Sequence, residues 1–430
     1  MEKDPGAEMT EMIPCVRKDL DFFPVNQGGQ KMVVIRDQLG IIPEDKVIDF
    51  SLFQVMALLD GTRTIRDLQM ELMRQRGGVL VSSDEVMSFM ANLDASYLLD
   101  SERYREAKGR MVAQFSSQKI RPPALCGRSY PDEPTQLKQM LDDILASRPP
   151  QTRLKGTLKA IVSPHIDLSA GARVYAGAYG MLRHVSPKRV ILLGTGHHMA
   201  DDLFCLTEKD FETPLGIVKN DSALVGRLIE AEPGIVAEND FEHRSEHSIE
   251  FQVLFLQHLL GTDSFTMLPI LCGSLMMNLP SYNQNAYLEK AGPFLEELKR
   301  IIREGDEGTL IVAGVDFSHI GLKFGHQNPA EYMASRAEAH DRNLLSALTE
   351  ADGDLFWEES IKVEDQYNVC GFSALACLLK ILPVCKGKVL DYQMWHEAAT
   401  QSAVSFSAVA FTGERQKKDP VDLIDDPGTL

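Results

Sequence analysis

From Leu158 onward, short apolar runs alternate with stretches in which apolar residues recur every three or four positions. Apolar runs of this length, separated by amphipathic helices, are typical of strands that are buried on both faces of a sheet. The pattern therefore predicts an α/β domain in which a mostly parallel or mixed sheet is covered by helices. The expected strands are 158–163, 189–193, 266–271, 309–315, 388–394 and 404–411. The expected helices are 171–183, 248–260, 287–303, 329–348 and 371–382.

The chain before residue 105 has a different pattern. Residues 24–40 predict a small β-ribbon, because an Asn/Gly-containing turn separates two extended candidates. Thr64 with Asp67, and Ser82 with Glu85, have the spacing of helix capping boxes, and each pair precedes apolar residues at helical spacing. With a last strand expected around 97–99, the pattern predicts a small winged-helix-like α+β domain.

These patterns divide the chain into five parts. We expect a flexible N-terminus at 1–19, the winged-helix-like domain at 20–105 and the α/β domain at 151–415. A polar, proline-punctuated stretch at 106–150 is expected to be a linker that leads into the second domain. Residues 416–430 form an expected polar tail.

Composition excludes several classes of protein. The 430 residues carry a formal net charge of -18, and an acidic surface of that size repels nucleic acid and anionic lipid. The N-terminus lacks a basic start and an apolar core, and no run of about 18 apolar residues occurs, so we expect neither export nor a membrane segment. Seven cysteines without a CxxC pair indicate reduced thiols. A cytoplasmic protein is the expectation.

Polar side chains follow three of the expected strands. The first strand runs into His165, the second into His197 and His198, and the fourth into Asp316 and His319. A single histidine at a strand end is more often structural, but three at equivalent positions favour a shared site. In open α/β sheets, ligands bind beyond the carboxyl ends of the strands. The sequence thus predicts one pocket that these residues line.

Two further segments can reach that pocket. Glu246, His247 and Glu250 lie at the start of an expected helix whose later residues are core-like. Cys370 precedes another apolar helix, where the helix dipole favours a thiolate. The residues alone leave two readings of Cys370 open: a reactive or metal-binding thiol, and a buried residue at a helix start.

The motifs, in their order, resemble the Memo family, which includes AmmeMemoRadiSam system protein B. The segments that carry the resemblance span approximately residues 121–413: SPHIDLSAG, LLGTGHH, EHSIEFQ, LPILCGSL, VDFSH, VCGFSAL and SAVSFSAVAFT. The fold of that family resembles the LigB-type (class III extradiol) non-haem iron dioxygenases. The resemblance implies a metal held by His165, His197 and Cys370. It also implies that His247, Asp316 and His319 lie beside that metal.

Two features depart from the family or lie outside it. Ile166-Asp167-Leu168 replaces the glycine-tyrosine that follows the family's PH motif, which we expect to bring a carboxylate close to the metal. The N-terminal domain, with its LLDGTRTIRDL segment, resembles PqqD-like domains instead. That resemblance implies that it docks a peptide or protein partner.

Two neutral imidazoles and a thiolate suit Fe(II), Cu or Zn and do not suit Mg or Ca. We prefer iron, with copper or zinc as alternatives, and expect a non-haem metal-dependent oxidoreductase. The family resemblance implies a radical-SAM partner. The expected catalytic residues are His247, Asp316, His319 and Cys370. Asp316 or Glu250 is a candidate to orient a ligand imidazole, and His247 or His319 a candidate to pass protons.

The alternative is an adaptor without turnover that binds a peptide or a metal in the same pocket. A serine hydrolase is disfavoured, because the sequence has no GxSxG elbow.

Overall fold

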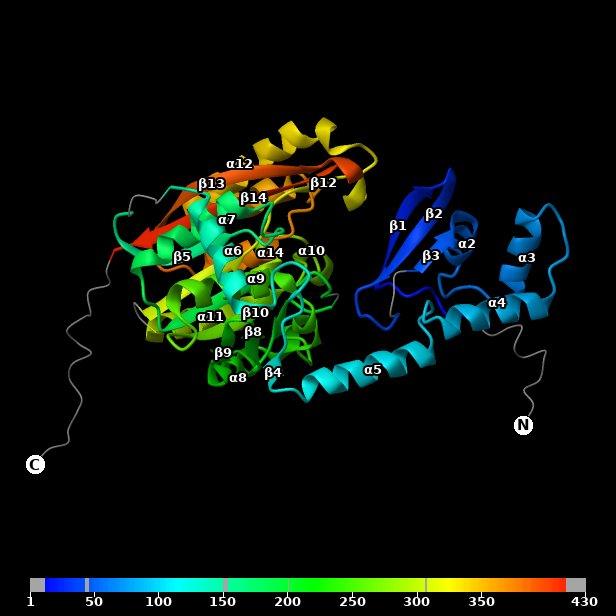
Figure 1. The fold of residues 1–430 in the computed structure, drawn as a ribbon, viewed down its shortest axis with the longest axis horizontal. Coiled ribbons are helices and arrows are strands. Elements are labelled where there is room, and N and C mark those ends of the chain that lie inside the picture. The colour runs from blue at the N-terminus through cyan, green and yellow to red at the C-terminus, as the bar shows by residue number, and fades with distance from the viewer. Residues whose placement is uncertain (1–11, 43–45, 150–153, 200, 306–307, 415–430) are drawn as a thin grey trace, which may run out of the picture. The chain divides into compact units, whose positions relative to one another are not determined.

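The computed structural model describes residues 12–42, 46–149, 154–199, 201–305 and 308–414. The chain divides into two compact units, Met1–Ser117 and Gln118–Leu430 (Figure 1). Much of the expected flexible N-terminus and the whole of the tail at 416–430 lie outside the described residues. No described helix combines the length and the apolar character needed to cross a membrane.

The N-terminal unit joins a three-stranded antiparallel sheet to a group of helices. Its sheet consists of β1 (Leu20–Gln27), β2 (Gln30–Asp37) and β3 (Lys46–Asp49), in that order. Its described helices are α2 (Phe50–Met56), α3 (Ile65–Gln75), α4 (Ser83–Ala95) and α5 (Glu102–Ser116). Both expected capping boxes are present, Thr64 with Asp67 and Ser82 with Glu85. The two boxes fix the starts of α3 and α4.

The strand expected at 97–99 is absent from this unit's described residues and is replaced by a turn. Tyr97 has a φ of 55°, in the left-handed region, and Leu99 makes only an isolated bridge with Val16. A left-handed residue does not continue an extended strand. The chain therefore turns here and enters α5.

The boundary between the units differs from the expected linker at 106–150. Most of α5 occupies the first part of that stretch, since Ser101 caps the helix and Tyr104, Ala107 and Phe115 are buried. The rest belongs to the C-terminal unit, where it forms β4 (Ile120–Arg121) and α6 (Pro134–Ala146). The sequence analysis did not predict α5, because only a narrow stripe of this helix is buried and most of its residues are polar.

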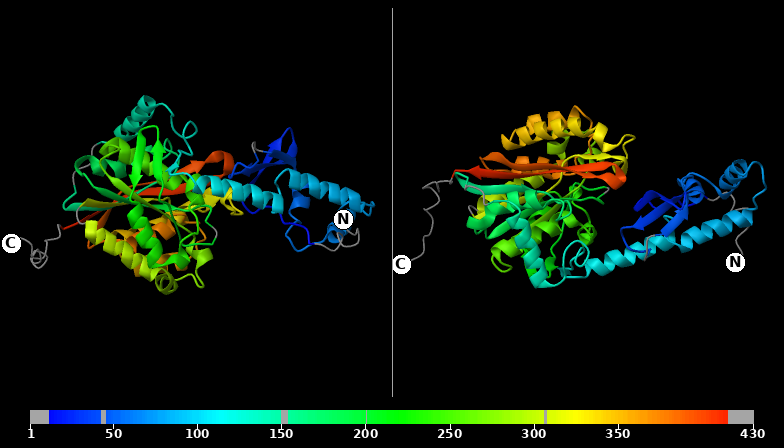
Figure 2. Two further views of the ribbon diagram at one scale, coloured as in Figure 1. Left: turned by 90° about the horizontal axis from the view of Figure 1, so that it is seen from below. Right: turned by 45° about the horizontal axis from the view of Figure 1, so that its top comes forward.

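The C-terminal unit is built on one mixed sheet of eleven strands among the described residues. At its centre β5 (Thr157–Ser163), β11 (Thr309–Gly314), β6 (Arg189–Thr195) and β10 (Thr266–Cys272) lie side by side and parallel. The long hairpin of β13 (Lys386–Glu397) and β14 (Ser402–Gly413) continues the sheet, with β14 antiparallel to β5 (Figure 2). The prediction of a mixed α/β sheet is confirmed.

Helices cover both faces of this sheet, as the apolar runs predicted. One core is formed with α6, α7 (Ala172–Tyr179) and α9 (His247–Leu260). The core on the other face is formed with α8 (Ser222–Ala231), α11 (Gln284–Gly305), α12 (Ala334–Thr349), α13 (Gly353–Ile361) and α14 (Phe372–Ile381). Successive strand residues alternate between the two cores, with Ile161 in the first and Val162 in the second.

Several short elements have no counterpart in the sequence analysis. They are β7 (Phe204–Leu206), β8 (Asp210–Thr213), β9 (Gly216–Asn220), β12 (His319–Gly321) and α10 (Leu275–Asn278). Segments of three to five residues are too short to show a periodicity, and the four strands among them pair with neighbouring strands.

A buried ion pair fastens the start of this unit to α9. Arg121, fully buried, forms an ion pair with Glu250 and donates hydrogen bonds of 2.8 Å to the carbonyl oxygens of His243 and Glu246. Glu250 also accepts from the Tyr130 hydroxyl and from the backbone N–H groups of Ala124 and Leu125. This network fixes the N-terminus of α9.

Replacing Arg121 by Met should destabilise the C-terminal unit by about 3–5 kcal/mol, because it leaves the Glu250 carboxylate buried without a counter-charge. The measurement is urea unfolding followed by tryptophan fluorescence, which reports this unit because Trp357 and Trp395 both lie in it. Lys386→Met is the control, since it breaks an exposed pair with Glu350 and should cost less than about 1 kcal/mol. Equal losses in the two variants would contradict the prediction.

Candidate functional site

Three of the central strands end at the same edge of the sheet, and the turns that follow them contain candidate site residues. Gly314 of β11 pairs with Ser163 of β5 and with Gly194 of β6. Because the three strands are parallel and in register, the residues that follow them emerge together. His165, His197 and Asp316 are these residues, as the sequence analysis expected.

Cys370 joins the group from the turn before α14. Its Sγ lies 3.4 Å from His165 Nε2 and 3.6 Å from the carbonyl oxygen of Asp316. The next residue, Gly371, donates its backbone N–H to the same carbonyl at 3.1 Å. One nitrogen each from His165 and His197 and the Cys370 sulfur all lie within 4.8 Å of one another. The structure thus places together the three residues that the family resemblance selected.

His165 is held as a neutral imidazole. Its side chain is 2% exposed, and its Nδ1 donates to the Gly314 carbonyl oxygen at 2.9 Å. Burial, together with the nearby His197 and His247 rings, lowers the pKa of His165 well below its ordinary value. The Nε2 lone pair is consequently available on the side that faces Cys370.

Glu246 contacts the imidazoles of both His197 and His247. Its carboxylate lies 3.0 Å from His197 Nδ1 and 3.2 Å from His247 Nδ1, and it caps α9 by accepting the N–H groups of His247 and Ser248. Burial alone would lower the pKa of His197, but the adjacent Glu246 carboxylate raises it well above the ordinary value. The two histidine rings stack with centroids 4.8 Å apart. One carboxylate therefore sets both the orientation and the charge of His197.

The Cys370 thiol is not activated as expected from its place near a helix start. Burial raises its pKa, and the hydrogen bond with His197 offsets only part of that effect. The helix α14 begins two residues later, at Phe372, and its dipole does not dominate. Removal of this proton requires a cation at the sulfur or a base beside it.

Asp316 bridges the His165 and Cys370 turns. Its Oδ1 accepts the backbone N–H of His165 at 3.0 Å, and its Oδ2 lies 3.6 Å from His165 Nε2. Burial raises the pKa of Asp316 to about 7, although these contacts favour the carboxylate. The group can thus hold or release a proton near neutral pH.

His319 lies further along the same turn and faces a cavity. The cavity has a volume of about 390 Å³, and His197, His319 and Cys370 all line it. Burial lowers the pKa of His319 to about 4, and its Nδ1 donates to the Phe317 carbonyl oxygen at 3.0 Å. His319 is therefore a neutral imidazole whose Nε2 can accept a proton.

Two expected carboxylates do not act at this site. Glu250 is engaged by Arg121 and Tyr130 and does not orient an imidazole. Asp167 is exposed and accepts from the Ser169 hydroxyl and the N–H groups of Ser169 and Ala170. Its carboxylate is therefore engaged by the local turn.

The sequence analysis missed the roles of Glu246 and Arg121. Glu246 directly precedes His247, so its position before an apolar helix was the available signal for an N-cap carboxylate. Nothing in the local pattern pairs Arg121 with Glu250, because the contact spans 129 positions.

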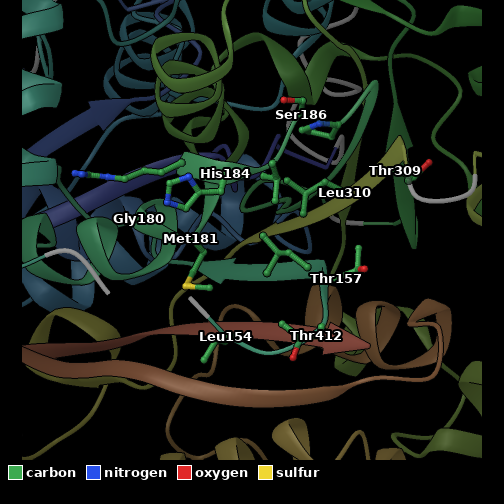
Figure 3. A pocket seen from close by; sticks show the side chains of 14 residues that line it. Leu154, Thr157, Gly180, Met181, His184, Ser186, Thr309, Leu310 and Thr412 are labelled. Carbon is green, nitrogen blue, oxygen red and sulfur yellow. The ribbon is translucent and has the colours of Figure 1, made fainter. Parts of the chain in front are cut away.

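A second cavity lies at the opposite edge of the sheet (Figure 3). It has a volume of about 370 Å³ and is lined in part by Thr157 and Thr309, the first residues of β5 and β11. None of the candidate site residues lines it. This cavity, at the amino ends of the strands, is therefore separate from the cluster of candidate site residues at their carboxyl ends.

Comparison with known proteins gives the family. A family model described as Memo-like protein matches residues 121–410. A MEMO1 family protein of Aquifex aeolicus is 30% identical over 401 residues, which cover 93% of this chain and 100% of that relative. A MEMO1 family protein of Thermus thermophilus is 26% identical over 347 residues, 80% of this chain and 97% of its own length.

The chain belongs to the Memo family. The matched range lies in the C-terminal unit and contains His165, His197 and Cys370. The alignment with the Aquifex aeolicus relative covers more of the chain than this unit alone can supply, so that Memo family protein also aligns with part of the N-terminal unit.

Replacing Glu246 by Gln should lower the pKa of His197, because the carboxylate charge is lost while the burial remains. Two-dimensional NMR titration of ¹³C-histidine-labelled protein measures this, with the His197 signal identified by its loss in His197→Gln. Glu238→Gln, at an exposed position, is the matched control. A His197 titration that is unchanged in Glu246→Gln would show that the Glu246 charge does not govern it.

Proposed function

We propose that this Memo family protein is a non-haem metal-dependent oxidoreductase that holds a divalent transition metal between His165, His197 and Cys370. Iron is the preferred metal, with copper or zinc as alternatives. The observation that carries the proposal is the convergence of two imidazoles and one thiol from three separate turns. Asp316, His319 and His247 would then act around the metal as proton-handling and orienting groups.

The spacing of the donor atoms fits a metal. A tetrahedral ion with metal–sulfur and metal–nitrogen bonds of about 2.3 and 2.0–2.1 Å holds its sulfur and nitrogen ligands about 3.6 Å apart. The distance from Cys370 Sγ to His165 Nε2 is 3.4 Å. The Nδ1 atoms of His165 and His197 already have partners, Gly314 and Glu246, which leaves each Nε2 for a metal.

The type of donor supports a transition metal. Imidazole and thiolate suit Fe(II), Cu and Zn, whereas Mg and Ca prefer oxygen ligands. Three protein ligands leave open positions, through which a redox metal supplies binding and activation of oxygen or a substrate atom. The chain's own groups would exclude bulk water around His165, hold a proton at Asp316 and offer an unprotonated acceptor at His319 Nε2.

The adjacent cavity supports a small substrate. Its lining combines apolar side chains such as Met276, Phe324 and Phe372 with Asp365, and includes no Lys or Arg. Burial raises the pKa of Asp365 to about 6, so this carboxyl is largely ionised at neutral pH.

For partners, we propose a radical-SAM protein, with docking of a peptide or protein segment on the N-terminal unit. A groove of about 760 Å³ between α2, α3 and α4 supports this, since Leu52, Val55, Val86 and Phe89 line it. Val55→Asp should weaken binding of a purified radical-SAM partner at least tenfold by calorimetry, because it places a charge among the apolar side chains of the groove. Val47→Asp on β3, outside the groove, is the control, and equal affinity of both variants would contradict groove docking.

The test of the central proposal is anaerobic purification followed by elemental analysis. Wild type should contain about one equivalent of transition metal, and the His165→Ala, His197→Ala double variant should lose it, because two of its three protein ligands are gone. His184→Ala is the control, since His184 lines only the cavity at the opposite edge. Turnover should disappear in Cys370→Ala without a change in melting temperature.

Two outcomes would contradict this function. Unchanged metal content in the double variant would remove the metal site. A stoichiometric metal without turnover, combined with peptide affinity that persists after chelation, would favour the adaptor.

A further inference from the structure

A further buried carboxylate has no part in the function proposed above. Asp341, in α12, is fully buried. Its carboxylate accepts hydrogen bonds from the hydroxyls of Ser318 at 2.6 Å, Ser405 at 2.5 Å and Tyr392 at 2.7 Å. Among the described residues, no cation forms an ion pair with it. Three hydroxyl groups from three parts of the fold thus stabilise one buried carboxylate.

Two of these hydroxyls belong to residues that fix the turn after β11. Ser318 lies in the turn, and its backbone N–H donates to Ser405 Oγ at 2.9 Å. The backbone of Ser405 continues the connection, because it accepts from Phe317 N–H at 2.8 Å and donates to the Ser318 carbonyl at 2.9 Å. Asp341 therefore closes a network that joins α12 and β14 to residues 317–318.

The same turn contacts both candidate ligand loops. Asp316, two residues before Ser318, accepts the His165 N–H through its side chain and the Gly371 N–H through its backbone. The residue after Ser318, His319, donates its N–H to the Tyr367 carbonyl oxygen at 2.8 Å, near the Cys370 turn. A shift of Ser318 would consequently move His165 and Cys370 relative to each other.

We propose that Asp341 is a positioning residue that acts through Ser318 to set the separation of the Cys370 sulfur and the His165 imidazole. The inference rests on the proposed metal site for its function. It assigns Asp341 no contact with a substrate or with the metal. Tyr392 gives the same carboxylate a hydroxyl from β13, which touches neither ligand loop in any described hydrogen bond.

The pair Ser318→Ala and Tyr392→Phe tests this, because each removes one hydroxyl from the same carboxylate and only Ser318 lies in the turn. The probe is Co(II), with binding measured by the thiolate-to-cobalt charge-transfer band. Ser318→Ala should bind Co(II) about 10–100-fold more weakly, as is usual when a group that supports a metal ligand is lost, and the band should be reduced. Tyr392→Phe should stay within threefold of wild type. Asp341→Asn, which keeps the shape, should follow Ser318→Ala.

A metal-free measurement separates this inference from the metal proposal. Crystal structures of metal-free wild type and Ser318→Ala should show the Cys370–His165 separation lengthened in the variant. Wild-type affinity and an unchanged separation in Ser318→Ala would overturn the inference, as would an equal loss of affinity in Tyr392→Phe. If wild type itself binds no Co(II), the metal proposal fails, and the crystallographic comparison still decides whether Asp341 positions the turn.

Discussion

The parallel register of β5, β11 and β6 is the constraint on which the site depends. Gly314 pairs with Ser163 on one side and Gly194 on the other, so the three strands end at the same level. A slip by one residue would reverse the face of every side chain in a strand and separate the turns. The two apolar cores oppose such a slip, because Ile161 and Val162 each belong to a different core. Packing of the sheet therefore determines the chemistry at its edge.

Electrostatics then distinguishes histidines that the backbone places side by side. His165 donates to a neutral carbonyl, and burial lowers its pKa, while His197 faces the Glu246 carboxylate, which raises its pKa. Glu246 holds this position because it caps α9, whose start is fixed by Arg121. The contacts of Arg121 in β4 thus influence the charge of His197 through Glu246 at the N-terminus of α9. Packing therefore decides which charged group lies beside His197.

The sequence predicts what periodicity and order along the chain can encode. The central strands, the capping boxes and the gathering of His165, His197 and Asp316 at one edge follow from apolar runs and from the rule for parallel sheets. Contacts between distant positions do not follow, and these decide the rest. Glu250 is engaged by Arg121, a contact between distant positions that no local pattern displays. Likewise, the Cys370 thiol is governed by burial, which no local pattern displays.

Burial of acidic groups around this site lowers the stability of the fold at neutral pH. Burial raises the pKa of Asp316 to about 7, and those of Asp341 and Asp365 to about 6. Between roughly pH 4 and these values the folded state binds protons that the unfolded state releases, so stability falls as the pH rises through that window. Asn at the same positions would avoid that loss. Their presence is therefore better explained by function than by stability, since perturbed carboxyl groups concentrate where function requires them.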